Sequence, residues 1–231
     1  MTEADLPQAG RYSEEPTFLD AYGFRPQWRG RVHLVAAIVA LPATLFLLLA
    51  AQSAMSRVAV GVFAASLVGT FSVSAAYHRV ARTPSGVKWF SRADHSMIFV
   101  LIAGTYTPIC LLALPASWGV SMLVAVWVVA LTGATFKMVR LGSGAGPDGS
   151  WLYIVLGWAA VLISPALIAS LDGPQLALMA TGGVIYTLGA IGFSRRWPDL
   201  VPHRFGYHEV WHTMTVAAGG CHFALVALVL P

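Results

Sequence analysis

The feature that most constrains the fold is a series of seven apolar runs, each long enough to cross a lipid bilayer. They cover approximately residues 33–55, 57–78, 94–114, 118–139, 151–171, 174–194 and 207–230. A hydrocarbon core of about 30 Å requires roughly 20 residues of helix, and every backbone polar group in lipid must be satisfied within the spanning structure. The runs do not show the period-two alternation that is typical of barrel strands. The sequence therefore predicts an all-α membrane protein, in which a polar N-terminal tail (1–32) precedes a single seven-transmembrane helix bundle (33–231).

The composition supports this assignment. Hydrophobic residues make up 57% of the chain and charged residues only 10%, whereas a soluble domain carries about 25% charged residues. The first 30 residues mix acidic and basic side chains without an apolar core, so we expect a polar tail and no cleaved signal peptide. Cys110 and Cys221 fall inside apolar runs, which is typical of small buried residues and not of a disulfide framework.

The distribution of lysine and arginine predicts the orientation of the bundle. The N-terminal tail and the connections on its side carry thirteen of these residues, and the opposite side carries only Arg57. By the positive-inside rule the N-terminus is cytoplasmic and the C-terminus, after an odd number of spans, is external. These basic residues form a cytoplasmic collar and not a groove that would bind nucleic acid, so we expect membrane lipids and no nucleic acid among the partners.

Given this orientation, four ionisable side chains from three spans lie at one depth near the cytoplasmic face. His78 ends the second span, Asp94 begins the third, and His208 and His212 lie four residues apart at the start of the seventh. Residues with this spacing lie on one face of a helix, and ionisable groups within spans usually face the bundle interior and one another. Three imidazoles with an oxygen-bearing neighbour are a common environment for catalytic zinc. We therefore predict zinc as the cofactor and His78, His208 and His212 as its ligands.

Two residues beside this set are assigned catalytic roles. Asp94 is expected to hydrogen-bond the metal-bound water, and Ser74, one turn from His78, is expected to be a second hydrogen-bonding group. An alternative remains open for Asp94, which as an acid at a helix N-terminus is favoured by the helix dipole alone.

The remaining histidines are interpreted as structural. His33 and His203 are expected to be interfacial or capping residues. His95 follows Asp94 directly and so points away from it on a helix, which favours a packing or head-group contact. His222 lies ten residues after His212, roughly 15 Å farther along the helix axis, so we expect a helix-helix hydrogen bond and not a contact with the same ion.

The segment from His208 to His212 also matches H-E-x-x-H, the zinc-protease motif in which the glutamate, here Glu209, acts as general base. A Leu-Asp-Gly segment containing Asp172 is similar to the aspartate motif of intramembrane site-2-type metalloproteases. The predicted topology places Asp172 at the external end of the fifth span, most of a bilayer away from His208, and the order of the motifs is reversed. We therefore expect Glu209 to face the cytoplasm or to support the ligands, and it remains the alternative base.

Three ordered motifs resemble the signature regions of the hemolysin III family. They are Ser74-x-x-x-His78, the stretch Phe90–Ser96 that runs into Leu101–Pro108, and His208-x-x-x-His212. That family belongs with the progestin and adiponectin receptors (PAQR) and, more distantly, with the alkaline ceramidases. The resemblance implies a bacterial-type protein of the plasma membrane, with a cytoplasmic N-terminus and a zinc ion held by the same three histidines, beside the same aspartate and serine.

Relatives in this wider superfamily hydrolyse lipid amides, notably ceramide. The resemblance therefore implies a zinc-dependent hydrolase of a lipid amide or ester that acts at the cytoplasmic side of the membrane. A non-enzymatic membrane sensor or homeostasis protein with structural zinc is the alternative. A pore-forming hemolysin is less favoured, because the outer halves of the spans lack a polar stripe.

Overall fold

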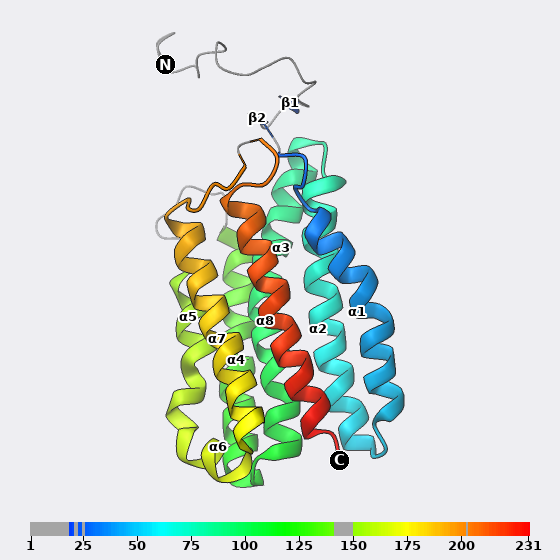
Figure 1. Cartoon of the computed structure of the whole chain (residues 1–231), viewed down its shortest axis with the longest axis vertical. Coiled ribbons are helices and arrows are strands. Elements are labelled where there is room, and N and C mark those ends of the chain that lie inside the picture. Colours follow the sequence, from blue (N-terminus) through cyan, green and yellow to red (C-terminus); the bar gives the residue numbers. More distant parts are fainter. Residues whose placement is uncertain (1–18, 21–22, 25, 141–149, 202) are drawn as a thin grey trace.

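Helices of membrane-spanning length stand side by side in the computed structural model (Figure 1). The structure describes residues 19–20, 23–24, 26–140, 150–201 and 203–231, so most of the predicted tail and the connection 141–149 lie outside it. Within the described residues, seven helical segments are long and apolar enough to cross a membrane. The prediction of a seven-helix membrane protein is confirmed.

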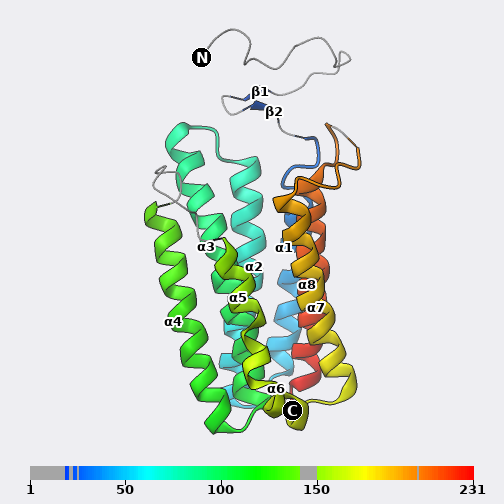
Figure 2. The same cartoon turned by 90° about the vertical axis from the view of Figure 1, so that its left-hand side faces the viewer.

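In the bundle α4 lies at one edge and α7 and α8 lie at the other, and α1 packs against both α2 and α8 (Figure 2). In chain order the spans are α1 (Arg31–Ala50), α2 (Ala54–Arg79), α3 (Pro84–Pro108) with the π-helix η2 (Ile109–Ala113), α4 (Ala116–Arg140), α5 (Trp151–Gly157) with the 3-10 helix η3 (Trp158–Ile163) and α6 (Ser164–Ser170), α7 (Gly173–Ser194) and α8 (Tyr207–Val229). A short antiparallel pair, β1 (Leu19–Asp20) and β2 (Gly23–Phe24), precedes them.

The third span begins well before the apolar run that predicts it. α3 starts at Pro84, and the Thr83 hydroxyl caps it by accepting a hydrogen bond from the Gly86 N–H at 3.2 Å. Proline is tolerated at the start of a helix because its missing N–H would have no helical partner there. The polar first turns, which hydropathy leaves out, thus belong to the helix. Asp94 lies inside α3 and not in its first turn, so the interpretation of Asp94 as a helix N-terminal acid is wrong.

One end of the bundle gathers the segments that carry the candidate site. α1 and α8 begin there and α2 ends there, whereas the C-terminus lies at the opposite end (Figure 1). The segment before α1 crosses the segment before α8, because the Gln27 N–H donates to the His203 carbonyl at 3.1 Å and the Trp28 N–H to the Arg204 carbonyl at 3.2 Å. The assignment of this end to the cytoplasm stays a prediction from the charge count.

The fifth span changes from an α-helix to a 3-10 helix, and a tyrosine from α3 forms hydrogen bonds with the backbone groups at this change. The Tyr106 hydroxyl donates to the Gly157 carbonyl at 2.9 Å and accepts from the Ala160 N–H at 2.7 Å. In lipid no water is present to satisfy backbone groups where a helix changes its hydrogen-bond pattern. Tyr106 takes this role at the junction of α5 and η3, and it fixes the fifth span against α3.

Candidate metal centre

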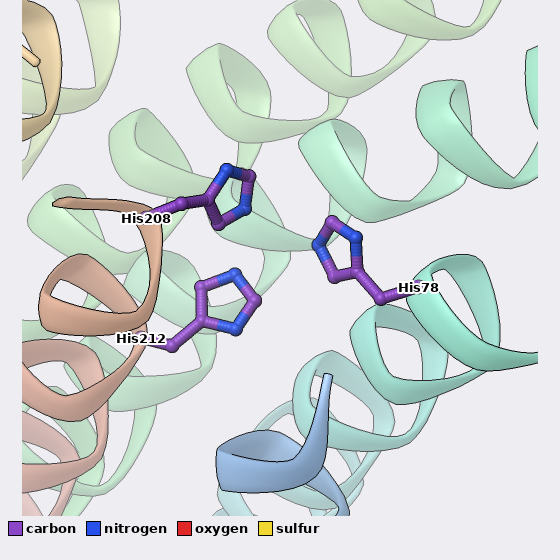
Figure 3. Close-up of side chains that lie close together, drawn as sticks. All are labelled: His78, His208 and His212. Atoms are coloured by element: carbon purple, nitrogen blue, oxygen red, sulfur yellow. The ribbon is translucent and has the colours of Figure 1, made fainter. Parts of the chain in front are cut away.

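Three histidines from α2 and α8 converge at this end of the bundle (Figure 3). One ring nitrogen each of His78, His208 and His212 lies within 4.8 Å of the other two. His78 lies in the last turn of α2, and the other two lie one turn apart at the start of α8. The ring centroid of His78 lies 4.9 Å from that of His208 and 5.0 Å from that of His212. The structure thus brings together the three predicted ligands, and their role in binding a metal stays a prediction.

The nitrogen atoms fit a zinc ion. Zinc binds imidazole nitrogen at about 2.0–2.1 Å in tetrahedral geometry, so two nitrogen ligands of one ion lie about 3.4 Å apart. The three rings need only a small adjustment to reach that distance from their present separation. His78 and His212 are buried, with 7% and 3% of their surface exposed, and neutral imidazole is the commonest metal-binding side chain. Three protein ligands also leave a fourth position, as catalytic zinc sites do.

Ser74 lies one turn before His78 on α2, and Asp94 of α3 lies close to Ser74. Ser74 is 1% exposed, and its hydroxyl has no hydrogen-bond partner among the described residues. Asp94 approaches Ser74 and His95 closely enough to interact electrostatically, although no well-formed hydrogen bond joins it to the serine. Asp94 does not join the group of nitrogens in the described part of the chain. A buried polar group without a partner is costly, so Ser74 presents a hydroxyl that a polar ligand atom would satisfy.

His33 is a member of the cluster that the sequence did not reveal. It lies in the first turn of α1, it is only 4% exposed, and its ring stacks on His212 at a centroid distance of 3.9 Å and an angle of 4°. The interfacial interpretation of His33 is therefore wrong. Parallel rings direct their in-plane lone pairs side by side and not toward one point, so His33 supports the ring of His212 without converging on the same ion. The depth of His33 in the predicted topology is the signal that could have placed it in the cluster, because the predicted orientation puts the start of α1 level with the other histidines.

Glu209, the glutamate of the protease-like motif, is engaged in holding the site together. It is 1% exposed, so the expectation that it faces the cytoplasm is wrong. Its Oε1 accepts from Arg29 Nε at 2.5 Å, and its Oε2 accepts from the Gly206 N–H at 2.9 Å, in the manner of a helix cap. Both oxygens are therefore occupied. Glu209 ties the segment before α1 to the helix that carries His208 and His212, which agrees with a supporting role.

The predicted separation between the two protease-like motifs is confirmed. Asp172 is exposed at the opposite end of the bundle, where it caps α7 by accepting from the Gln175 N–H at 2.8 Å. The 22 residues of α7 lie between it and the end where His208 lies, a distance of about 33 Å. Asp172 therefore has a capping role far from the histidine cluster.

Two other histidines lie outside the group of three. His95 Nδ1 is 2.7 Å from the Ser91 carbonyl of its own helix, in agreement with the packing interpretation. His222 lies deeper in the bundle, where its ring stacks on Tyr186 at a centroid distance of 5.8 Å. The expected separation of His222 from the other α8 histidines is confirmed.

The ion pair between Arg29 and Glu209 leads to the first prediction. Arg29→Ala is expected to lower the free energy of unfolding by about 3–5 kcal/mol, because it leaves the carboxylate of Glu209 buried without a cation. The matched control is Arg82→Ala, an exposed arginine between α2 and α3, for which we expect a change within about 0.5 kcal/mol. Denaturant titration in mixed micelles measures both variants. Equal effects of the two substitutions would contradict the structural role of the pair.

Known proteins match most of this chain. A family model described as Haemolysin-III related matches residues 24–223, which include the first six spans and both α8 histidines of the centre. Hemolysin-3 of Bacillus cereus is 33% identical over 205 residues, which cover 86% of this chain and 89% of that protein. The hemolysin-3 homolog of Bacillus subtilis (strain 168) is 30% identical over 197 residues, which cover 84% of this chain and 89% of that protein.

Proposed function

The chain belongs to the Haemolysin-III related family of integral membrane proteins, and from this premise we propose that it is a zinc-dependent hydrolase of a lipid amide or ester. The observation that carries the proposal is the convergence of three imidazoles at one end of a membrane-spanning bundle. When bound, zinc supplies Lewis acidity that polarises a carbonyl group and makes water a nucleophile at neutral pH. His78, His208 and His212 are the residues that would hold it.

A cavity of about 460 Å³ supports a lipid as the substrate. Ile98 and Thr215 line it, and each lies one helical turn deeper than a residue of the centre, Asp94 on α3 and His212 on α8. The cavity therefore begins directly below the histidine cluster and continues into the apolar part of the bundle. Hydrocarbon is the part of a lipid that such a space accepts.

The walls of the cavity also reach the surface that faces lipid. Trp158, Val161 and Ile168 line it, and they are 43%, 57% and 66% exposed on the outside of the bundle. All three belong to the irregular fifth span, which faces α7 across the cavity. We expect an acyl chain to enter here from the bilayer, since no hydrocarbon chain needs to cross water on this route.

In the proposed reaction Asp94 transfers the proton and Ser74 stabilises the developing negative charge. The carboxylate of Asp94 accepts a proton from the attacking water as the water oxygen bonds to the carbonyl carbon. The same proton passes to the leaving amine or alkoxide when the C–N or C–O bond breaks, so that atoms and charges balance. The Ser74 hydroxyl donates a hydrogen bond to the substrate carbonyl oxygen, where negative charge develops.

Metal removal is the direct test of the proposal. Purified protein is expected to contain about one zinc per chain and to hydrolyse one class of lipid amide or ester in a broad panel of bilayer lipids. Treatment with a chelator should abolish this hydrolysis and added zinc should restore it, while added magnesium should not, because magnesium prefers oxygen ligands. Stoichiometric zinc without turnover of any lipid, together with unchanged cellular lipids in a His78→Ala strain, would refute the hydrolase.

A second function is favoured by the position of the histidines. They join α2 to α8, two helices that are far apart in the sequence, so a zinc ion there would clamp the bundle in a membrane sensor or homeostasis protein without catalysis. In either case we propose the bacterial plasma membrane as the location. The two functions differ in what they require of Asp94.

A further inference from the structure

The far part of the cavity contains two polar groups that the proposed reaction does not use. Tyr186 of α7 and His222 of α8 both line the cavity. The Tyr186 hydroxyl and His222 Nδ1 are buried, and neither has a hydrogen-bond partner among the described residues. Leaving such groups unsatisfied in an apolar interior costs free energy, so their presence in the wall indicates a ligand that satisfies them.

The hydrogen-bonding character of this pair defines the ligand group. The Met179 backbone lies close enough to the His222 ring to interact with it electrostatically, and the Nε2 edge of the ring lies against Gly182, where a Cβ atom would come within 2.6 Å of Nε2. Because Nδ1 has no partner among the described residues, we assign the donor role toward the Met179 backbone to Nε2, which leaves Nδ1 as an acceptor. The Tyr186 hydroxyl both donates and accepts. A hydroxyl group is the neutral ligand group that can donate to Nδ1 and accept from Tyr186 at once, whereas a ketone would leave Nδ1 unsatisfied.

The distance to the metal centre places that hydroxyl along the ligand. His222 follows His212 by ten residues of one helix, about 15 Å along the axis. Carbon-carbon bonds of about 1.5 Å with angles near 111° span this distance in roughly a dozen carbons. We propose that the cavity binds a lipid with a hydroxylated acyl chain, whose mid-chain hydroxyl is recognised by Tyr186 and His222. The carbon count rests on the proposed function, which places the lipid carbonyl at the metal centre, whereas the preference for a hydroxyl rests on the cavity alone.

Binding of two fatty acids that differ only in this group tests the proposal. 12-Hydroxyoctadecanoic acid and octadecanoic acid are titrated into the purified protein in micelles, with the fluorescence of the lining residues Trp158 and Trp211 as the signal. The wild type is expected to bind the hydroxylated acid at least about tenfold more tightly. Tyr186→Phe and His222→Leu should each reduce this ratio to near one and leave the affinity for octadecanoic acid within about twofold.

Two further measurements make the result decisive. The Tyr186→Phe protein without ligand should melt at the same temperature as the wild type or higher, because the hydroxyl that it loses has no protein partner. Repeating the titration with the zinc-site variant His78→Ala separates the two proposals, since a retained preference supports the hydroxyl site even where no hydrolysis occurs. The same affinity for both acids in the wild type, as expected if water occupies the pair, would overturn the proposal, and so would a preference that survives both substitutions.

Discussion

The variant His78→Ala is expected to lose the bound zinc and with it all lipid hydrolysis above background. His78 is the only one of the three converging histidines that comes from α2. Without it, two imidazoles of a single helix remain, and the clamp between distant parts of the chain is lost. Loss of a residue that only supports a ligand lowers metal affinity 10–100-fold, so loss of a ligand should lower zinc affinity by at least about 100-fold. Metal analysis of the purified variant measures this directly.

The matched control for this variant is His222→Leu, which removes another buried histidine from the same bundle. It lies about 15 Å from His212 along α8 and should retain about one zinc per chain. His208→Ala should behave as His78→Ala does, because its nitrogen belongs to the same group. Zinc retained in both His78→Ala and His208→Ala would remove the basis of every mechanism that uses this centre.

Much of this centre could be predicted because two simple rules act on the same residues. Helical periodicity puts His208 and His212 on one face of α8. The charge count then places the end of the second span level with the start of the seventh, and this selects His78. Depth and spacing alone thus predict that these three histidines converge, and the structure brings them together.

What the sequence could not predict depends on contacts between segments. Glu209 lies in a polar segment, which favours an accessible position, but it is buried and pairs with Arg29, 180 residues earlier in the chain. His33 appeared interfacial because it stands at the edge of an apolar run, and only the packing of α1 against α8 shows that it stacks on His212. Neither contact leaves a periodic signal in the sequence.

The fold was predicted to the level of its spans, but not in its irregular parts. Hydropathy identifies the hydrocarbon segment and not the helix, so it missed the polar turns of α3 between Pro84 and Asp94. It also treated the fifth span as one helix, whereas the span changes to a 3-10 helix between Trp158 and Ile163. Tyr106 of α3 forms hydrogen bonds with the backbone groups at this break. This is a tertiary contact, which local sequence patterns do not predict.

Asp94→Asn is expected to lower lipid hydrolysis by about 10²–10⁴-fold, which is the usual contribution of a general base, while zinc stays bound. The substitution keeps the size of the side chain and removes its ability to accept a proton. Because Asp94 lies outside the group of three nitrogens, zinc content should not change. The readouts are turnover of the hydrolysed lipid and metal content, measured on the same preparation.

The outcome of this substitution decides between a catalytic and a structural ion. If zinc only clamps α2 to α8, Asp94→Asn should leave the cellular phenotype intact, whereas His212→Ala should still destabilise the fold because it removes a ligand. The matched control is Asp172→Asn at the opposite end of the bundle, where asparagine also caps a helix well. Full turnover in Asp94→Asn would reject Asp94 as the base. Among the described residues no other free carboxylate would then remain at the centre, since both oxygens of Glu209 are held by Arg29 and Gly206. A structural clamp would be the better account of the three histidines.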